Sequence, residues 1–360
     1  MNNQKVKVLI LGNRIMHYRV PIFNILSEIF DVTVVYSYPL DFMIAVQCKF
    51  KTLHLPARKI SKFLIHNHDI FELCNQYDVV IAFGQIVYLK YSTLGLRKNK
   101  QFKLIYWGIG VAASYTRKYD QSSWLHNKLE YFLKSKADAL VFYTDYPKKK
   151  YVENGYNSDA LFTAVNTVEV EKIKFDLDKK DSIIFIGTLY KQKGIMSLFE
   201  EYEKAYKINN NIPILKIIGG GNDLVLVRKW ILEHNLSDKI LSLGPIYDSK
   251  KKKEIFETAI ACFSPNQAGL SVLECMGYGI PFITLRDAIT GGEIFNIENN
   301  VNGIILDNKT KMSEIILDIA SNSKYYITMG NNAYNYYWNF RKPPDMAKGL
   351  IDAINYVSNK

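Results

Sequence analysis

A regular alternation of short apolar runs with segments of helical periodicity constrains the fold of this chain more than any other feature of its sequence. Val6–Leu11 and Val32–Tyr36 are apolar runs of strand length, and Pro21–Phe30 between them carries apolar residues at helical spacing. The same alternation continues in the second half of the chain. Because strands separated by helices pair in parallel, the pattern predicts an α/β fold of doubly wound parallel sheets.

The chain has 360 residues, which is long for one domain, and the alternation resets near residues 161–165. We therefore expect two Rossmann-like domains, one over residues 1–165 and one over residues 166–339, followed by a last helical segment at 340–360. The individual elements that the periodicity predicts include helices at 65–76, 86–94 and 124–134 and strands at 79–83, 183–186 and 282–284.

Composition argues against several classes of protein. No stretch reaches the roughly 18 consecutive apolar residues of a membrane-spanning helix, and no leader-like segment precedes the first strand. The four cysteines show no C-x-x-C spacing and the six histidines form no zinc-type cluster, which favours reduced thiols and no structural metal. We expect a cytoplasmic protein.

Positive charge is concentrated in the first half of the chain. The formal net charge is +11, of which residues 1–165 carry +10. This excess suggests an anionic partner, namely an anionic membrane surface, a lipid diphosphate or nucleic acid. Interleaved aromatic residues favour the membrane, although any single cluster could be a solvated surface. The basic clusters lie at Arg58 to Lys62, Arg97 to Lys103, Arg117-Lys118 and Lys148 to Lys150.

The segment from Ser264 to Thr284 joins an apolar run to a short helical pattern through a polar loop. Gly269, Leu270 and Ser271 open the helical pattern, where backbone N–H groups favour an anion. Glu274 follows within reach of a hydroxylated ligand over the helix start. The segment predicts a site for a phosphate joined to a ribose; the alternative is an ordinary turn whose small residues allow close packing.

A second loop, from Gly187 to Gly194, follows the apolar run 183–186 and precedes another helical pattern. Lys193 in this loop would place an ammonium beside a phosphate, where it stabilises charge that grows on a leaving group. The alternative is a solvated loop with two lysines, Lys191 and Lys193. Ligands of doubly wound sheets bind at the carboxyl ends of strands, which is where both loops fall.

The first half carries a comparable loop after its first strand. Gly12 and Asn13 would let a ligand approach closely, and Arg14 and Arg19 could hold a phosphate. His17 could orient or accept the proton of a hydroxyl group, although packing at the start of the next helix would explain this histidine equally well.

The two loops of the second half resemble the donor-binding motifs of glycosyltransferase family 4, whose members have the GT-B fold of two Rossmann-like domains facing each other across a cleft. The family motif has two glutamates eight residues apart; Glu274 fits the second, and Asn266 replaces the first. The loop at Gly187 resembles G-R-L-x-x-x-K-G, with Lys193 retained and Thr188 in place of arginine.

Other segments resemble the same family. The sequence H-Y-R-V-P from His17 resembles the end of the family's first loop, and residues 106–110 resemble W-G-H-G, with Ile109 in place of the histidine between Gly108 and Gly110. Thr290 to Ile294 resembles the loop that closes the donor pocket. The resemblance also implies that the C-terminal helix, 340–360, packs back on the N-terminal domain.

What the resemblance implies is a retaining glycosyltransferase, of hexosyl or deoxyhexosyl type, without cofactor or metal. The donor would be a nucleotide diphosphate sugar and the acceptor a glycan or a polyprenyl-diphosphate-linked glycan, in the synthesis of bacterial surface polysaccharide such as lipopolysaccharide. The implied catalytic residues are His17, Lys193 and Glu274. The implied donor-binding residues are Gly187, Thr188, Lys193, Asn266, Gly269, Leu270, Ser271 and Glu274, and the acceptor or phosphate loop comprises Gly12, Asn13, Arg14, Arg19, Gly108 and Gly110.

The three altered positions, Ile109, Thr188 and Asn266, leave a second hypothesis open, in which the chain binds a nucleotide sugar with weak or no catalysis. A GT-B epimerase or phosphorylase would share the architecture. A nucleic-acid-binding protein would explain the charge but not the Glu274 segment. We expect no nucleic acid partner and a peripheral location on the inner face of the cell membrane.

Overall fold

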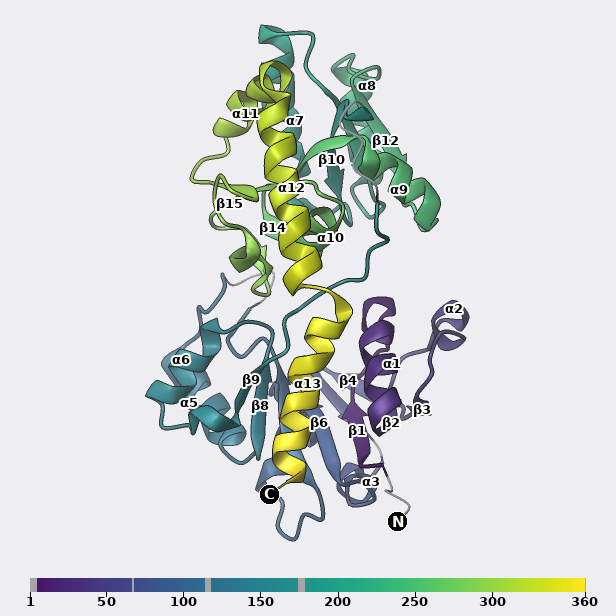
Figure 1. Ribbon diagram of the computed structural model, residues 1–360, viewed down its shortest axis with the longest axis vertical. Coiled ribbons are helices and arrows are strands. Elements are labelled where there is room, and N and C mark those ends of the chain that lie inside the picture. The colour runs from purple at the N-terminus through teal and green to yellow at the C-terminus, as the bar shows by residue number, and fades with distance from the viewer. Residues whose placement is uncertain (1–4, 67, 114–117, 174–178, 360) are drawn as a thin grey trace. The chain divides into compact units, whose positions relative to one another are not determined.

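The computed structural model describes all residues except 1–4, 67, 114–117, 174–178 and 360. The chain divides into two units, and Figure 1 labels most of their elements. The first unit comprises Met1–Ala112, Asp120–Glu169 and Lys342–Lys360, and the second comprises Ala113–Tyr119 and Val170–Arg341. The division therefore falls after Glu169, and a short segment that follows the fifth strand of the first sheet groups with the second unit.

The first unit is built on a seven-stranded parallel sheet. Its strand order is β3-β2-β1-β6-β7-β8-β9, so the order reverses beside β1. The strands are β1 (Lys7–Leu11), β2 (Asp31–Tyr36), β3 (Lys51–His54), β6 (Val79–Phe83), β7 (Lys103–Gly108), β8 (Ala139–Phe142) and β9 (Leu161–Thr163).

Helices cover both faces of this sheet, because successive strand residues point to opposite sides. Val8 and Ile10 belong to a core shared with α1 (Val20–Ile29) and α13 (Pro343–Ser358). Leu9 and Leu11 belong to the core on the other side. The C-terminal helix α13 is thus part of the first unit, and its inward residues Met346, Leu350, Ala353 and Ile354 are fully buried. The remaining helices are α2 (Phe42–Ala45), α3 (Ile70–Cys74), α4 (Leu89–Ser92), α5 (Trp124–Lys134) and α6 (Tyr146–Glu153).

The predicted helix at 65–76 is wrong in its first part. Residues 57–66 instead form an antiparallel hairpin of β4 (Ala57–Ile60) and β5 (Phe63–His66). The His66 ring is buried, and its Nε2 lies 2.9 Å from the Ser37 hydroxyl and 2.8 Å from that of Tyr91. Helix α3 begins only at Ile70, and the Asp69 carboxylate caps its N-terminus. The predicted helix at 86–94 is shortened to Leu89–Ser92, whereas the predicted helix at 124–134 is confirmed.

The second unit contains a six-stranded parallel sheet of order β12-β11-β10-β13-β15-β17. Its strands are β10 (Ser182–Ile186), β11 (Ile214–Ile218), β12 (Ile240–Gly244), β13 (Ala259–Phe263), β15 (Phe282–Leu285) and β17 (Gly303–Leu306), and β14 (Gln267–Ala268) pairs with β16 (Ile289–Thr290). Its helices are α7 (Ile195–Ile208), α8 (Leu224–Glu233), α9 (Ser249–Glu257), α10 (Ser271–Gly277), α11 (Lys311–Ser321) and α12 (Ser323–Phe340).

Close packing of α10 against α12 depends on Gly277. A Cβ on Gly277 would lie 2.4 Å from a methyl of Val170 and 3.2 Å from the Tyr337 ring. The Trp338 indole N–H donates to the Gly277 carbonyl at 3.0 Å. Tyr337 and Trp338, near the end of α12, therefore pack this helix against α10.

Both sheets confirm the predicted doubly wound parallel class. In each, the strand order reverses between the first strand and its neighbour, and a crevice opens at the carboxyl ends of that strand pair. We therefore expect ligands to bind at the loops after β1 and β6 in the first unit, and after β10 and β13 in the second. Among the described residues, no helix combines the length and apolar character that a bilayer span requires.

Candidate functional site

The loop after β10 brings Lys193 back over the strand end. Gly187 has a φ of +139°, which a side chain would disfavour, and a Cβ there would lie 2.7 Å from the Lys193 Nζ. Lys193 ends a short 3₁₀ turn, and Gly194, with a φ of +73°, then starts α7. The two glycines therefore allow the lysine side chain to fold inward at the switch point of the sheet.

Lys193 is a buried cation that has no partner among the described residues. Its side chain is 7% exposed. In the described part of the chain it has neither a hydrogen-bond acceptor nor a carboxylate for its ammonium. Burial lowers its pKa to about 8, an effect that Cys262 partly opposes. Binding of an anion next to this ammonium is favourable, because the anion compensates the buried charge.

Asn266 lies directly beside this lysine loop. Its backbone N–H donates to the Lys193 carbonyl at 3.4 Å, and a Cβ on Gly194 would lie 2.5 Å from its Nδ2. The loops after β10 and β13 are thus in contact, as expected for adjacent strands. Thr188 is exposed near the start of the same loop.

Glu274 lies in the first turn of α10, and its side chain is 15% exposed. Its carboxylate forms an ion pair with the ammonium of Lys252 from α9. The start of α10 is open, because a Cβ on Gly269 would meet no atom within 4 Å; Leu270 and Ser271 follow it there. However, α10 has only seven residues, fewer than two full turns, so its own dipole contributes little to binding an anion.

The sequence analysis missed a third part of this site, the glycines that follow β11. A Cβ on Gly219 would lie 1.9 Å from the Gly187 carbonyl oxygen, and one on Gly221 would lie 2.4 Å from that of Leu189. Both have positive φ, 157° and 143°. This run lets the neighbouring loop approach the Gly187 loop. The signal was present as three consecutive glycines directly after an apolar run.

The loop at 290–294 uses its amides internally. The buried Glu293 carboxylate accepts from the Gly291 N–H at 2.8 Å, and the Thr290 hydroxyl accepts from the Gly292 N–H at 3.0 Å. Neither amide is therefore free to bind a ligand in this structure.

In the first unit, a cavity of about 310 Å³ opens at the corresponding switch point. Gly12, Asn13, Arg14 and Arg19 of the loop after β1 line it, and so does Gly108 at the end of β7. Six aromatic rings line it as well, and its lining contains no carboxylate. These rings belong to Tyr18, Phe23, Phe83, Tyr88, Trp107 and Tyr143.

The two arginines of this cavity differ in role. Arg19 donates to the Asn166 Oδ1 at 2.9 Å and to the Met346 Sδ at 2.8 Å, and three aromatic rings surround it at 5.1 Å. Arg19 therefore joins α13 and Asn166, both in the first unit, to the wall of this cavity. Arg14 is exposed and lies 4.5 Å from the centre of the Tyr38 ring. Its guanidinium is the more accessible of the two.

Of the other residues predicted for a site in the first unit, some line this cavity and some do not. His17 is exposed and is not among the residues that line the cavity. Ile109 lines it, and the buried Trp107 indole N–H has no hydrogen-bond partner in the described residues. Gly110 serves packing, because a Cβ there would lie 2.5 Å from the Phe142 ring.

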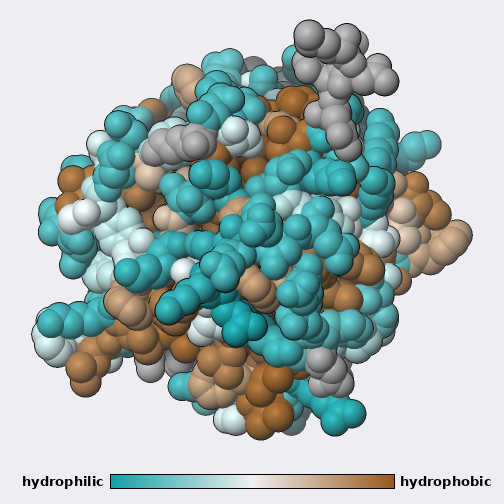
Figure 2. Space-filling view, turned by 90° about the horizontal axis from the view of Figure 1, so that it is seen from below, coloured by the Kyte–Doolittle hydropathy of each residue, from teal (hydrophilic) through white to brown (hydrophobic). Residues whose placement is uncertain are grey.

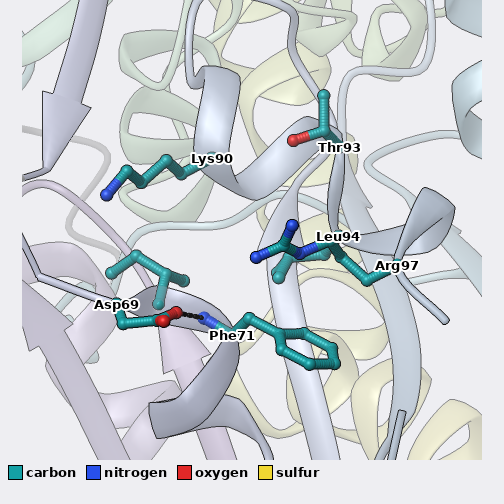
Figure 3. Close-up of a pocket in the computed structure, with 7 residues that line it drawn as sticks. Asp69, Phe71, Lys90, Thr93, Leu94 and Arg97 are labelled. Carbon is teal, nitrogen blue, oxygen red and sulfur yellow. Dashed lines mark hydrogen bonds between the residues drawn. The ribbon is translucent and has the colours of Figure 1, made fainter. Parts of the chain in front are cut away.

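A larger cavity of about 450 Å³ lies elsewhere in the first unit and contains none of the predicted residues (Figure 3). The Asp69 carboxylate in it caps α3 by accepting from the Phe71 N–H at 3.0 Å, and Lys90 donates to the His68 carbonyl at 2.8 Å. Its polar groups thus have structural roles, and we assign it no ligand. The described residues contain no cluster of metal-ligating side chains, and Arg117 lies outside them.

Comparison with known proteins found one family model and one relative that each match part of the chain. Residues 168–336 match the family model described as glycosyl transferases group 1. An uncharacterized glycosyltransferase of Methanocaldococcus jannaschii is 25% identical over 253 residues, which are 63% of this chain and 64% of that protein. The match thus spans less than two thirds of the relative's length.

Several solved structures share the fold. HepE of Anabaena, in complex with UDP, superimposes with a TM-score of 0.73 at 12% identity, covering 98% of this chain and all of that one. The lipopolysaccharide outer core galactosyltransferase WaaB reaches 0.67 at 15% identity, and TarM reaches 0.71 at 13%, each covering 97% of this chain and 99% of its own. Residues 168–336 are therefore similar to the group 1 glycosyl transferases, and the fold of the chain is that of the GT-B glycosyltransferases.

Proposed function

We propose that the chain is a retaining glycosyltransferase that moves a sugar from a nucleotide diphosphate sugar to a glycan or lipid-linked acceptor. The observation that carries this proposal is the partnerless, buried ammonium of Lys193 at the switch point of the second sheet. A leaving diphosphate is the anion that this position suits, because ligands of such sheets bind there.

In this proposal Lys193 stabilises the negative charge that grows on the leaving diphosphate as the sugar bond breaks. Asn266, beside the lysine loop, hydrogen bonds sugar hydroxyls, and the open backbone at Gly269 and Ser271 admits the donor. Glu274 accepts from the ribose hydroxyls, sharing its carboxylate with Lys252. The leaving phosphate itself takes the acceptor proton, so no metal or cofactor is needed.

The acceptor in this proposal occupies the aromatic cavity of the first unit. Rings such as Trp107 and Tyr143 suit the apolar faces of sugars, and the unpartnered Trp107 N–H can donate to a hydroxyl group. Arg14 supplies accessible positive charge for an acceptor that carries a phosphate. Because His17 is exposed and does not line the cavity, its proposed contact with the acceptor requires movement of the first loop.

Further support comes from what similar structures contain. HepE was solved with UDP and with UDP-glucose, and WaaB is named as a transferase of the lipopolysaccharide outer core. We therefore propose a role in bacterial surface polysaccharide synthesis, at the cytoplasmic face of the membrane and without a nucleic acid partner.

The test is a thermal-shift screen of UDP, GDP and their sugars with the purified chain. A donor at a hundredfold excess over its dissociation constant should stabilise the protein by about 2.7 kcal/mol. Lys193→Met should lose this stabilisation, and Lys191→Met, an exposed lysine of the same loop, should keep it. If both variants bind equally, Lys193 does not hold the diphosphate.

A nucleotide-sugar-binding protein without catalysis is the second candidate. The observation that favours it is Ile109, an aliphatic side chain in the acceptor cavity where the related motif has a histidine. Slow hydrolysis of a bound donor separates the two candidates, because a transferase releases some sugar to water and a binding protein releases none. A donor that binds but remains intact over long incubation would favour the second candidate.

A further inference from the structure

Helix α5 (Trp124–Lys134) turns its large apolar residues toward solvent. Trp124 is 65% exposed, Leu125 71%, Leu129 47% and Phe132 53%. Leu125, Leu129 and Phe132 follow one another at spacings of four and three, so they form one stripe along the helix. Seen from below, the surface of the protein carries apolar patches between hydrophilic ones (Figure 2).

Two charged residues of α5, Glu130 and Lys134, lie on its inward side. The Lys134 ammonium lies 2.9 Å from the Glu130 carboxylate and donates to the Tyr151 hydroxyl at 2.9 Å. The side chains of Lys134 and Glu130 are only 8% and 13% exposed. A surface helix ordinarily buries its apolar face and exposes its charges. In α5 only Leu133 among the large aliphatic residues is buried, whereas Trp124, Leu125, Leu129 and Phe132 face solvent, which indicates that the outer face meets an apolar environment.

A rim of cations borders this stripe. The Lys128 ammonium lies 3.9 Å from the centre of the Trp124 ring, and that of Lys136 lies 5.3 Å from the centre of the Phe132 ring. The Lys100 ammonium donates to the Lys136 carbonyl at 3.3 Å, which brings the basic loop 97–100 beside the end of α5. None of these three lysines pairs with a carboxylate of the described residues. The charge of the rim is therefore uncompensated.

We propose that the outer face of α5, with the basic loop 97–100, is a docking surface for an anionic lipid bilayer. Apolar side chains would enter the acyl boundary, while Lys128 and Lys136 remain at the level of the headgroups. Trp124, aromatic and carrying an indole N–H, suits the same boundary. This surface would be where the membrane association of the proposed function takes place. It does not depend on the chemistry of the donor site.

Charge selects the bilayer over a second copy of the chain. A symmetric dimer through α5 would bring the same face of both copies together, so two uncompensated cationic rims would meet. An anionic bilayer neutralises that charge, and each lysine near its surface contributes about 1 kcal/mol.

The experiment is flotation with vesicles of phosphatidylcholine, alone or mixed with phosphatidylglycerol. The protein should bind the mixed vesicles, release from them as salt rises, and bind phosphatidylcholine alone weakly. The double variant Lys128→Gln, Lys136→Gln should weaken binding to mixed vesicles by roughly 30-fold, since two lysines at about 1 kcal/mol each are lost. Lys250→Gln, Lys251→Gln, a matched change on the exposed face of α9, should leave binding unchanged.

A second variant, Leu125→Ser with Phe132→Ser, tests the apolar stripe. It should abolish flotation while retaining the thermal shift with UDP, which shows that the fold and donor site are intact. The proposal is overturned if either α5 variant floats like the unchanged protein, or if both vesicle types bind equally. It is also overturned if the apolar variant converts a dimer to a monomer, because a second copy would then be the occupant. If UDP gives no thermal shift with the unchanged protein, the donor proposal is contradicted, whereas the conclusion from flotation is unaffected.

Discussion

Replacing Lys193 by methionine should make the ligand-free protein more stable. Methionine has nearly the shape of the lysine stem but no charge to bury. At neutral pH the folded protein must keep the Lys193 ammonium charged although burial lowers its pKa from 10.5 to about 8. Each unit of pKa corresponds to 1.36 kcal/mol, so the buried charge costs about 3 kcal/mol of folding free energy.

The effect should have a defined dependence on pH. Between pH 8 and 10.5 the unfolded chain binds more protons at this lysine than the folded chain does, so the stability of the unchanged protein rises with pH. The extra stability of Lys193→Met over the unchanged protein should therefore be largest below pH 8 and should vanish near pH 10.5. Lys191→Met, in the same loop but exposed, should change stability by less than about 0.5 kcal/mol at any of these pH values.

The assay is differential scanning calorimetry of the three proteins without and with UDP. For a unit the size of Val170–Arg341, about 3 kcal/mol raises the transition temperature by about 6–12 °C. UDP should raise it further for the unchanged protein and for Lys191→Met, but not for Lys193→Met. A methionine variant that melts lower than the unchanged protein, or that still responds to UDP, would refute the argument that this cation is held at a cost in order to bind an anion.

Three further predictions concern other parts of the two units. Gly187→Ala should remove the UDP thermal shift and destabilise the protein, because its Cβ displaces the Lys193 ammonium, whereas Gly269→Ala meets open space and should fold normally by circular dichroism. Glu274→Gln should weaken UDP binding in isothermal titration, while Lys252→Met, which removes only the ion-pair partner, should not. Burial, with help from Lys90, lowers the pKa of His66 to about 4. Because the unfolded chain binds more protons at this residue, the protein should lose roughly 3 kcal/mol of stability through it as the pH falls from 6.5 to 4. In urea titrations over this range, the stability of His66→Gln should fall less steeply than that of the unchanged protein, and an equal slope in both proteins would contradict the assignment.

The parallel sheets could be predicted from the sequence because every strand beside a switch point is a continuous apolar run. Ile183 to Ile186 is buried on both faces of its sheet, so its character does not depend on which neighbours surround it. The hairpin at 57–66 could not be predicted in this way. Ala57–Ile60 is largely exposed and carries two basic residues, and the apolar residues of the second strand also suit the start of a helix.

In the candidate site, too, some features could be predicted from the local sequence and others could not. The positions of Lys193 and Asn266 at strand ends followed from the local pattern. The role of Gly219 did not, because it depends on a carbonyl 32 residues away in the neighbouring strand's loop. The ion pair between Lys252 and Glu274 was missed because it joins two helices that meet only in the folded unit. Contacts between elements, rather than the elements themselves, are what the sequence pattern left undetermined.

The position of α13 has a consequence for how the protein is made. Six of its side chains, from Met346 to Val357, lie in the core of the first unit with no exposed surface. A ribosome synthesises these residues after the whole second unit, so the sheet of the first unit waits with one apolar face uncovered until α13 emerges. Nascent chains that stop short of residue 343 can close the second unit but not the first, and such products should be sorted to chaperones and proteases.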